Sequence, residues 1–156
     1  MPMAVCFQPM SHYSSKLVSL DAMKAISIPR CAKPFVEGLN DGLIRYQMCS
    51  RCCTVQNLAR YRCLACGAKE LGWKDSVGLG IVEAATEIRR ASDPAFQAMI
   101  PYAILLVRMQ EGFSLMAIED SEAINPKQVM QIGDCVRLRA RRWGDHMGLV
   151  AFRASP

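Results

Sequence analysis

The chain has 156 residues, of which 51% are hydrophobic and 21% charged, with a net charge of +5; this composition is that of a soluble globular protein rather than a disordered one. Its largest apolar run, residues 98–107, is interrupted by Pro101 and is far shorter than the roughly 20 residues that span a bilayer. The first nine residues lack the features of a secretory signal, so we expect a cytoplasmic protein without membrane contact.

Two short helices are predicted before the first cysteine pair. The first ends near Pro29 and carries apolar residues at three-residue spacing, namely Leu17, Leu20, Met23 and Ile26. The second covers residues 34–40, with Pro34 in its first turn and Phe35 and Leu39 on one face, and it stops around Gly42. Residues 1–42 are therefore predicted to form a helical extension.

Four cysteines dominate the next segment, residues 43–76, where Cys49-x2-Cys52 is separated by ten residues from Cys63-x2-Cys66. Two residues between paired cysteines let both thiolates of a tight turn reach one ion, and four thiolates in a tetrahedron suit zinc. Since the protein then fills every coordination position, the predicted zinc is structural rather than catalytic. The spacing also fits an iron centre with the same ligands, or a pair of thiol/disulfide switches.

Strand-like stretches at residues 43–48, 59–62 and 71–75 flank these cysteines and complete a predicted zinc ribbon. Gly67 follows the second pair and suits the unusual backbone angles of such a turn, whereas Cys53 stands at the corresponding place after the first pair. Three further cysteines, Cys6, Cys31 and Cys135, share no ligand spacing and are interpreted, like Cys53, as packed or surface side chains. With so little apolar material here, metal binding is expected to supply most of the folding energy.

Five short strands are predicted in residues 77–156. They cover residues 80–88, 102–109, 113–118, 134–141 and 148–154. Residues 110–112 form a tight hairpin signal between the second and third strands, and a longer link through Asn125-Pro126 precedes the fourth. This arrangement predicts a small Greek-key barrel of the OB type, so the fold class is mainly β.

A catalytic set is not apparent in the sequence. The only histidines, His12 and His146, lie far apart, and no G-x-S-x-G elbow is present. Glu119, Asp120 and Glu122 are interpreted as a solvated turn. The sequence Gly78-Leu79-Gly80 leads into a strand rather than a helix, so a bend at a barrel corner is favoured over a phosphate loop. We therefore expect no catalysis by this chain alone.

One predicted strand is strongly basic. In residues 136–141 three apolar side chains would face the barrel interior (Val136, Leu138 and Ala140), and three arginines would line its outside (Arg137, Arg139 and Arg141). Arg142, Trp143 and Arg153 extend the basic patch. It is either a solvated outer face or a surface for phosphates or an acidic partner. Aromatic residues make up only 7% of the chain, which disfavours nucleic-acid binding.

The order of these parts resembles the acyl-CoA-associated zinc-ribbon/OB-fold family, also known as domain of unknown function thirty-five. The resemblance covers about residues 30–153 and is carried by the segment 34–44, the CSRC and CLACG pairs, and residues 71–88, 93–112 and 131–141. Cys53 stands where a glycine is usual in that family, and residues 58–62 replace the Pro-Arg often found between the pairs.

The resemblance implies a rubredoxin-like zinc ribbon, with Cys49, Cys52, Cys63 and Cys66 as ligands, and an OB-fold barrel. Members of the family look like non-catalytic accessory subunits of thiolase-type enzymes, such as benzoylsuccinyl-CoA thiolase or diacetylphloroglucinol acyltransferase; others partner steroid-degrading hydratases or aldolases. It implies a hetero-oligomer with a thiolase-like catalytic subunit that shares a coenzyme A thioester site.

Residues 91–101, flanked by Arg89 and Arg90, are our candidate for the contact with that catalytic subunit. Two alternatives remain open at this point. One is a protein that binds single-stranded nucleic acid, and the other is a thiol-based redox sensor in which Cys53 reacts beside Cys52.

Overall fold

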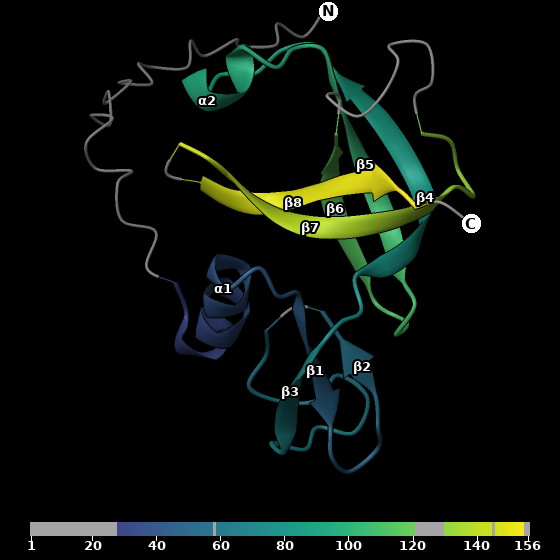
Figure 1. Ribbon diagram of the computed structural model, residues 1–156. Helices are drawn as coiled ribbons and strands as arrows, with labels where there is room; N and C mark the ends of the chain where they lie inside the picture. Colours follow the sequence, from purple (N-terminus) through teal and green to yellow (C-terminus); the bar gives the residue numbers. More distant parts are fainter. Residues whose placement is uncertain (1–27, 58, 121–129, 145, 155–156) are drawn as a thin grey trace, which may run out of the picture.

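The computed structural model describes residues 28–57, 59–120, 130–144 and 146–154. These residues form a short helix, a three-stranded ribbon and a closed five-stranded barrel, with the ribbon below one end of the barrel in Figure 1. The helix predicted to end near Pro29, together with His12, Glu122 and the Asn125-Pro126 link, lies outside the described residues. No helix in the described ranges is long and apolar enough to cross a bilayer.

Helix α1 spans Lys33–Asn40 and follows a 3₁₀ turn at Arg30–Ala32. Pro34 lies in its first turn, where a backbone N–H would have no partner in the helix. The helix ends at Asn40, and two residues later Gly42, with a φ of 78°, lets the Leu43 N–H donate to the carbonyl of Gly38 at 2.7 Å. The predicted helix is thus confirmed, beginning one residue earlier.

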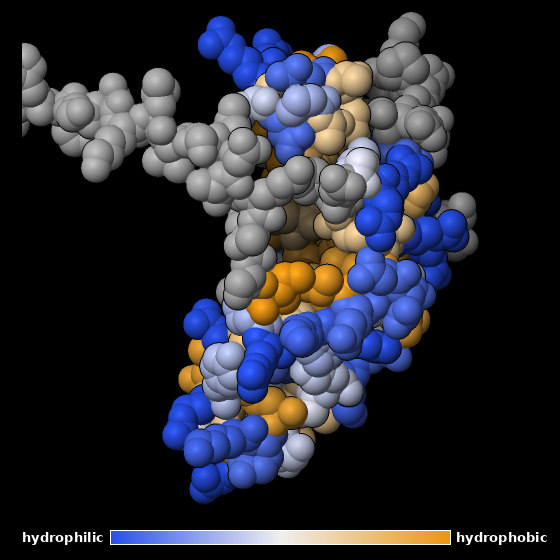
Figure 2. Space-filling model, turned by 90° about the vertical axis from the view of Figure 1, so that its left-hand side faces the viewer, coloured by the Kyte–Doolittle hydropathy of each residue, from blue (hydrophilic) through white to orange (hydrophobic). Residues whose placement is uncertain are grey.

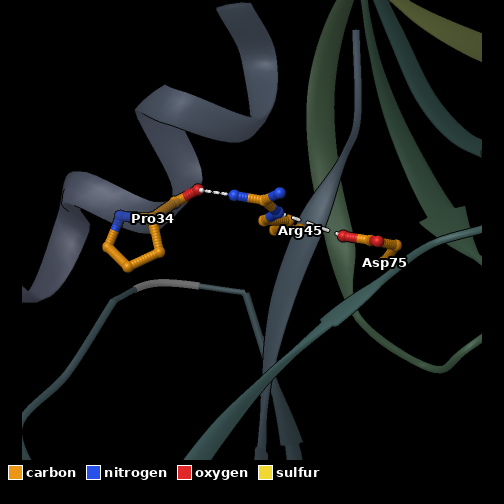
Figure 3. Close-up of polar contacts among 3 residues, drawn as sticks. All are labelled: Pro34, Arg45 and Asp75. Atoms are coloured by element: carbon orange, nitrogen blue, oxygen red, sulfur yellow. Dashed lines mark hydrogen bonds and ion pairs between the residues drawn. The ribbon is translucent and has the colours of Figure 1, made fainter. Parts of the chain in front are cut away.

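Arg45 ties this helix to the ribbon. Its guanidinium donates to the carbonyl of Pro34 at 3.3 Å and to the carboxylate of Asp75 at 3.1 Å, so one side chain bridges α1 and strand β3 (Leu71–Asp75; Figure 3). Gly38 lets the two pack closely, because a Cβ there would lie 2.9 Å from the Arg45 side chain.

The ribbon consists of β1 (Arg45–Cys49), β2 (Val55–Gln56) and β3 (Leu71–Asp75), in the antiparallel order β2-β1-β3. The strand predicted at residues 59–62 was wrong, because these residues lie in a loop and the second strand is β2. The reason is that a side chain satisfies the backbone here. The Arg60 N–H donates to the Gln47 side-chain oxygen at 2.9 Å, and its carbonyl accepts from Gln47 Nε2 at 3.1 Å.

The barrel contains strands β4 (Leu79–Ile88), β5 (Tyr102–Met109), β6 (Ser114–Glu119), β7 (Cys135–Trp143) and β8 (His146–Arg153), with the short helix α2 (Pro94–Gln97) before β5. Its strand order is β4-β5-β6-β8-β7, and β4 pairs with β7 to close it. Only β6 and β8 pair in parallel among these ladders. The predicted five-stranded OB-type barrel and its β5–β6 hairpin are confirmed, while β7 and β8 extend further toward their own hairpin.

Alternation along the strands fills the barrel interior. Val136 and Leu138 of β7 are 0% and 3% exposed, while Arg137 and Arg139 between and after them are exposed, as predicted. The bend at residues 78–80 is also confirmed. Gly78 has a φ of 77°, and a Cβ on Gly80 would lie 2.6 Å from the Arg108 carbonyl oxygen, so only glycine fits this close approach of β4 to β5.

Glu119 and Asp120 do not lie in a solvated turn, so that interpretation was wrong. They are 8% and 4% exposed. The Glu119 carboxylate accepts the backbone N–H of Met130 at 2.7 Å, and Asp120 pairs with Arg141 at 3.1 Å. Both charges are buried because each has a donor at the end of β6, where the sequence pattern alone showed only clustered acids.

The ribbon and the barrel share a core. Leu39, Ile44 and Tyr46 belong to the same buried cluster as the barrel interior, and the Tyr46 ring stacks on Phe113 at 5.0 Å. Polar contacts add to this junction: Asn57 donates to the Ser114 carbonyl, and Glu111 accepts from the residue 76–77 linker. The ribbon is therefore fixed to the barrel by packing and hydrogen bonds. The predicted division of the chain into segments at residues 42 and 76 stays a prediction.

Candidate metal centre

The four predicted metal ligands come together although they lie on separate turns. Cys49 ends β1 and Cys52 follows in the next turn, while Cys63 and Cys66 lie in the loop between β2 and β3. Their sulfur atoms all lie within 4.8 Å of one another, an arrangement that can hold one metal ion. The Sγ atoms of Cys49 and Cys66 are 3.7 Å apart, and those of Cys52 and Cys63 are 3.5 Å apart.

These separations fit a tetrahedral thiolate site. With a Zn–S bond of about 2.3 Å, two sulfurs on the same tetrahedral ion lie about 3.8 Å apart. Cys49 and Cys63 are buried, at 0% and 4% exposure, and Ala68 and Leu71 pack against them. Cys52 and Cys66 are exposed. An ion held here would therefore lie close to the surface with one side covered by the ribbon.

The two cysteine turns have the same backbone hydrogen bonds. The N–H of Cys53 donates to the carbonyl of Cys49 at 2.9 Å, and the N–H of Gly67 donates to that of Cys63 at 3.0 Å. Both residues are in the left-handed region, with φ of 58° at Cys53 and 72° at Gly67. The equivalence predicted for Cys53 and Gly67 is thus present, and Cys53 is the non-glycine residue that adopts this costly conformation among the described residues.

The thiol protons are held unevenly when no cation is bound. Hydrogen bonds from the Thr54 hydroxyl and backbone N–H lower the pKa of Cys52 to about 6, and the backbone N–H of Cys66 lowers the pKa of Cys63. At Cys66 the backbone N–H of Ala68 acts in the same direction, but contacts with the thiols of Cys52, Cys49 and Cys63 and partial loss of solvent outweigh it and raise the pKa to about 12. A cation between the sulfurs would favour the ionised form of these thiols.

A buried amide pair, which the sequence pattern did not reveal, positions the second cysteine turn. Gln47 and Gln56 are 3% and 4% exposed, and Gln56 Nε2 donates to Gln47 Oε1 at 3.0 Å. The Gln56 oxygen in turn accepts the N–H of Leu64, next to Cys63, at 3.1 Å. A glutamine that faces the interior of a strand would have indicated this pair. The sequence does not show which side chain of a two-residue strand faces inward.

The remaining predicted residues lie elsewhere. Cys31 approaches the Ala59 carbonyl at 3.7 Å, and Cys135 is exposed at the start of β7. His146 begins β8 on the barrel, away from the cysteine ligands in the ribbon. Among the described residues, the cluster that could hold a metal consists of Cys49, Cys52, Cys63 and Cys66, and it includes neither Cys31 nor Cys135.

The basic strand is only partly neutralised. Arg141 pairs with Asp120 and Arg153 with Asp134 at 2.9 Å, while the guanidinium carbons of Arg139 and Arg141 lie 5.3 and 5.9 Å from the centre of the Phe152 ring. The aromatic ring on this face is thus occupied by guanidinium groups rather than open for base stacking.

Residues 91–101, the candidate partner contact, lie against one end of the barrel. Phe96 of α2 has ring contacts with Tyr102 at 6.2 Å and Trp143 at 6.1 Å. Figure 2 shows hydrophobic surface in the middle of the face between α2 and the ribbon, bordered below by hydrophilic surface. This loop is therefore anchored by aromatic packing at one end of a partly apolar face.

Comparisons with known proteins support the fold. No family model and no curated protein matches the chain. Among solved structures it is similar to one described as the Ltp2-ChsH2(DUF35) aldolase, with 24% identity, a TM-score of 0.72, and coverage of 83% of this chain and 98% of that chain. A protein of unknown function from the DUF35 family of Sulfolobus solfataricus has 16% identity and a TM-score of 0.56, with coverage of 85% and 92%. The chain therefore has the fold of DUF35 family proteins, with a four-cysteine ribbon joined to a closed five-stranded barrel.

Proposed function

We propose that this chain is a non-catalytic, zinc-binding accessory subunit of a thiolase-like enzyme that condenses or cleaves acyl-CoA. The observation that carries the proposal is the closed set of four cysteine sulfurs, all within 4.8 Å of one another. Four thiolates fill a tetrahedral ion, so no position remains for water or substrate. The metal then stabilises the ribbon, and the chemistry belongs to a second polypeptide.

Zinc is the ion that this donor set favours, with Cys49, Cys52, Cys63 and Cys66 as the ligands. Soft thiolates in a tetrahedral arrangement suit Zn²⁺, which has no redox chemistry of its own. When bound, the ion supplies the positive charge that keeps all four thiols ionised. The reducing cytoplasm, where we place this protein, keeps such thiols available for metal rather than for disulfides.

The partner part of the proposal rests on the similar structures. One of them is described as the Ltp2-ChsH2(DUF35) aldolase, a description that couples a DUF35 chain with Ltp2 in an aldolase. For this chain we propose a thiolase-like subunit in a hetero-oligomer, with a coenzyme A thioester bound beside the barrel. Residues 91–101, anchored by Phe96 against Tyr102 and Trp143, are the proposed contact.

The test is affinity purification of the tagged full chain from its native host, followed by mass spectrometry and metal analysis. We expect about one zinc per chain, together with a thiolase-like subunit. Cys63→Ser is expected to lose both, since Cys63 is a buried ligand. Cys135→Ser is the matched control, because Cys135 is exposed on the barrel outside the cluster and its loss should change neither.

Recovery of nucleic acid without any thiolase homologue would contradict this proposal and favour the nucleic-acid alternative. The redox alternative predicts instead that mild oxidation releases zinc reversibly from the intact chain and that Cys53→Ala abolishes this response. Each of the three functions therefore gives a different result in the same preparation.

A further inference from the structure

A cavity of about 250 Å³ lies at the junction of the ribbon and the barrel. Three segments line it: the turn between α1 and β1, the linker from the ribbon to β4, and the middle of β7 (residues 42–44, 76–78 and 137–139). Among the described residues, its lining contains two charged side chains, Arg137 and Arg139, and no acidic one. The cavity therefore carries a positive charge that its own walls do not balance.

The ion pairs among the described residues do not include Arg137 or Arg139. Elsewhere on the same face Asp120 pairs with Arg141 and Asp134 with Arg153, but the described residues provide no carboxylate for Arg137 or Arg139. Of the residues predicted to form the basic patch, only these two arginines line the cavity. The sequence showed a uniform basic patch. Among the described residues, the structure distinguishes Arg141 and Arg153, which pair with carboxylates, from Arg137 and Arg139, which do not.

Both guanidinium groups are held in place by their neighbours. Arg137 donates to the carbonyl of Val77, which also lines the cavity, at 3.2 Å, and this contact leaves most of its five N–H donors unused. Arg139 lies over the Phe152 ring at 5.3 Å. Planar guanidinium groups fixed in this way lose little freedom when they bind a tetrahedral oxyanion.

The acceptors near the cavity have hydrogen-bond partners of their own, although the charge of Glu111 partly offsets that of the two arginines. Glu111 contacts the linker, but its two oxygens accept from the Ser76 hydroxyl at 3.0 Å and the Val77 N–H at 2.8 Å. The carbonyls at the end of α1 are also used, since Leu39 accepts from Gly42 and Gly38 from Leu43.

We infer that this cavity binds the phosphate or diphosphate end of a small molecule through Arg137 and Arg139. Its volume supports a group of this size, because sites that enclose a whole drug-sized ligand measure roughly 300–1,000 Å³. The rest of the ligand would extend from the open junction between ribbon and barrel. The inference rests on the proposed function in one respect, since the coenzyme A thioester proposed there carries such a diphosphate, but binding here does not require the catalytic partner.

The test is titration of the isotopically labelled, zinc-loaded full chain with inorganic diphosphate at low salt, followed by amide NMR and calorimetry. We expect shifts at Gly42, Val77, Gly78 and Leu138, and binding that weakens as sodium chloride is added. A parallel titration with ADP compares the affinity for a nucleotide with that for diphosphate, which shows whether the rest of the nucleotide contributes to binding.

The double variant Arg137→Gln/Arg139→Gln is expected to lower the affinity for diphosphate about tenfold or more. The matched control is Arg142→Gln, which removes one charge from the same strand but outside the cavity, where Arg142 donates to the Asn40 side chain at 3.2 Å. The affinity of Arg142→Gln for diphosphate should stay within about twofold of that of the parent chain. If the double variant does not fold, as judged by thermal unfolding, the two single variants serve instead.

Equal losses in the double variant and the control would overturn the inference, because they would show a general effect of charge. Shifts confined to other parts of the barrel would also overturn it, as would no response to diphosphate or ADP at about 10 mM. None of these results would change which subunit co-purifies with the chain, so they leave the test of the proposed function separate.

Discussion

Replacement of Cys53 by glycine is predicted to stabilise the ribbon. Cys53 has a φ of 58°, and left-handed backbone costs a residue with a Cβ about 1–2 kcal/mol. Glycine removes that cost but adds about 0.5–1 kcal/mol of chain entropy in the unfolded state. The net gain is therefore about 1 kcal/mol, even though the variant removes a side chain and adds no contact.

Because folding of the ribbon is coupled to metal binding, the same gain appears in two assays. In competition with a chromophoric chelator, Cys53→Gly should bind zinc roughly fivefold more tightly. In thermal unfolding followed by circular dichroism, a chain of 156 residues should gain about 2–4 °C. Both measurements use the zinc-loaded full chain under reducing conditions.

Two variants separate backbone strain from thiol chemistry. Cys53→Ala keeps the Cβ and removes the sulfur, so it should match the parent within about 0.5 kcal/mol. Gly67→Ala imposes the same strain on the second turn, where φ is 72° and a new Cβ would meet no atom within 4 Å. It should weaken zinc binding by about the amount that Cys53→Gly strengthens it.

A gain in Cys53→Ala equal to that in Cys53→Gly would refute this reasoning, since alanine retains the left-handed penalty. So would weaker zinc binding in Cys53→Gly, which would indicate that the Cys53 sulfur itself takes part in holding the metal. The equivalent hydrogen bonds of the two turns predict neither result.

Three further outcomes are expected. Leu105→Ala, at a side chain with 0% exposure, should cost about 2–5 kcal/mol in urea unfolding, whereas the neighbouring Leu106→Ala, at 37% exposure, should cost well under half of that. The hydroxyl of Ser114 and the guanidinium of Arg108 hold the pKa of Glu83 below its usual range. The stability that Glu83 contributes is therefore present above about pH 4.3, the usual pKa of a glutamate, and is lost as the pH falls through the lower pKa of the folded state. Glu83→Gln should make the free energy of unfolding less dependent on pH in this acidic range, and an unchanged dependence would contradict this. Chelation of zinc should unfold the ribbon, so the amide NMR signals of Met48 and Trp73 should lose their chemical-shift dispersion, while those of Val107 and Val136 in the barrel core persist. Simultaneous loss of both sets would argue against a ribbon that alone depends on the metal.

The sequence determined the parts that depend on local pattern. Paired cysteines two residues apart define the metal turns, since the ligand geometry of one turn is set within four residues. Strict alternation fixed which side of β7 faces the barrel interior, because neighbouring side chains of a strand point to opposite faces. Gly78 and Gly80 predicted a bend because glycine has no Cβ, and the structure contains this bend.

Only the tertiary structure decided which polar groups meet. Residues 59–62 contain a plausible strand pattern, but the buried Gln47 side chain binds the Arg60 backbone and leaves those residues in a loop. Glu119 and Asp120 look like a solvated turn until Met130 and Arg141 arrive from distant positions to pair with them. Likewise the sequence shows a row of arginines, and only the pairing across the barrel tells which are neutralised and which face a cavity. The physical reason is that such groups are stabilised or left unpaired by partners far along the chain, whose proximity is set by the packing of the whole fold.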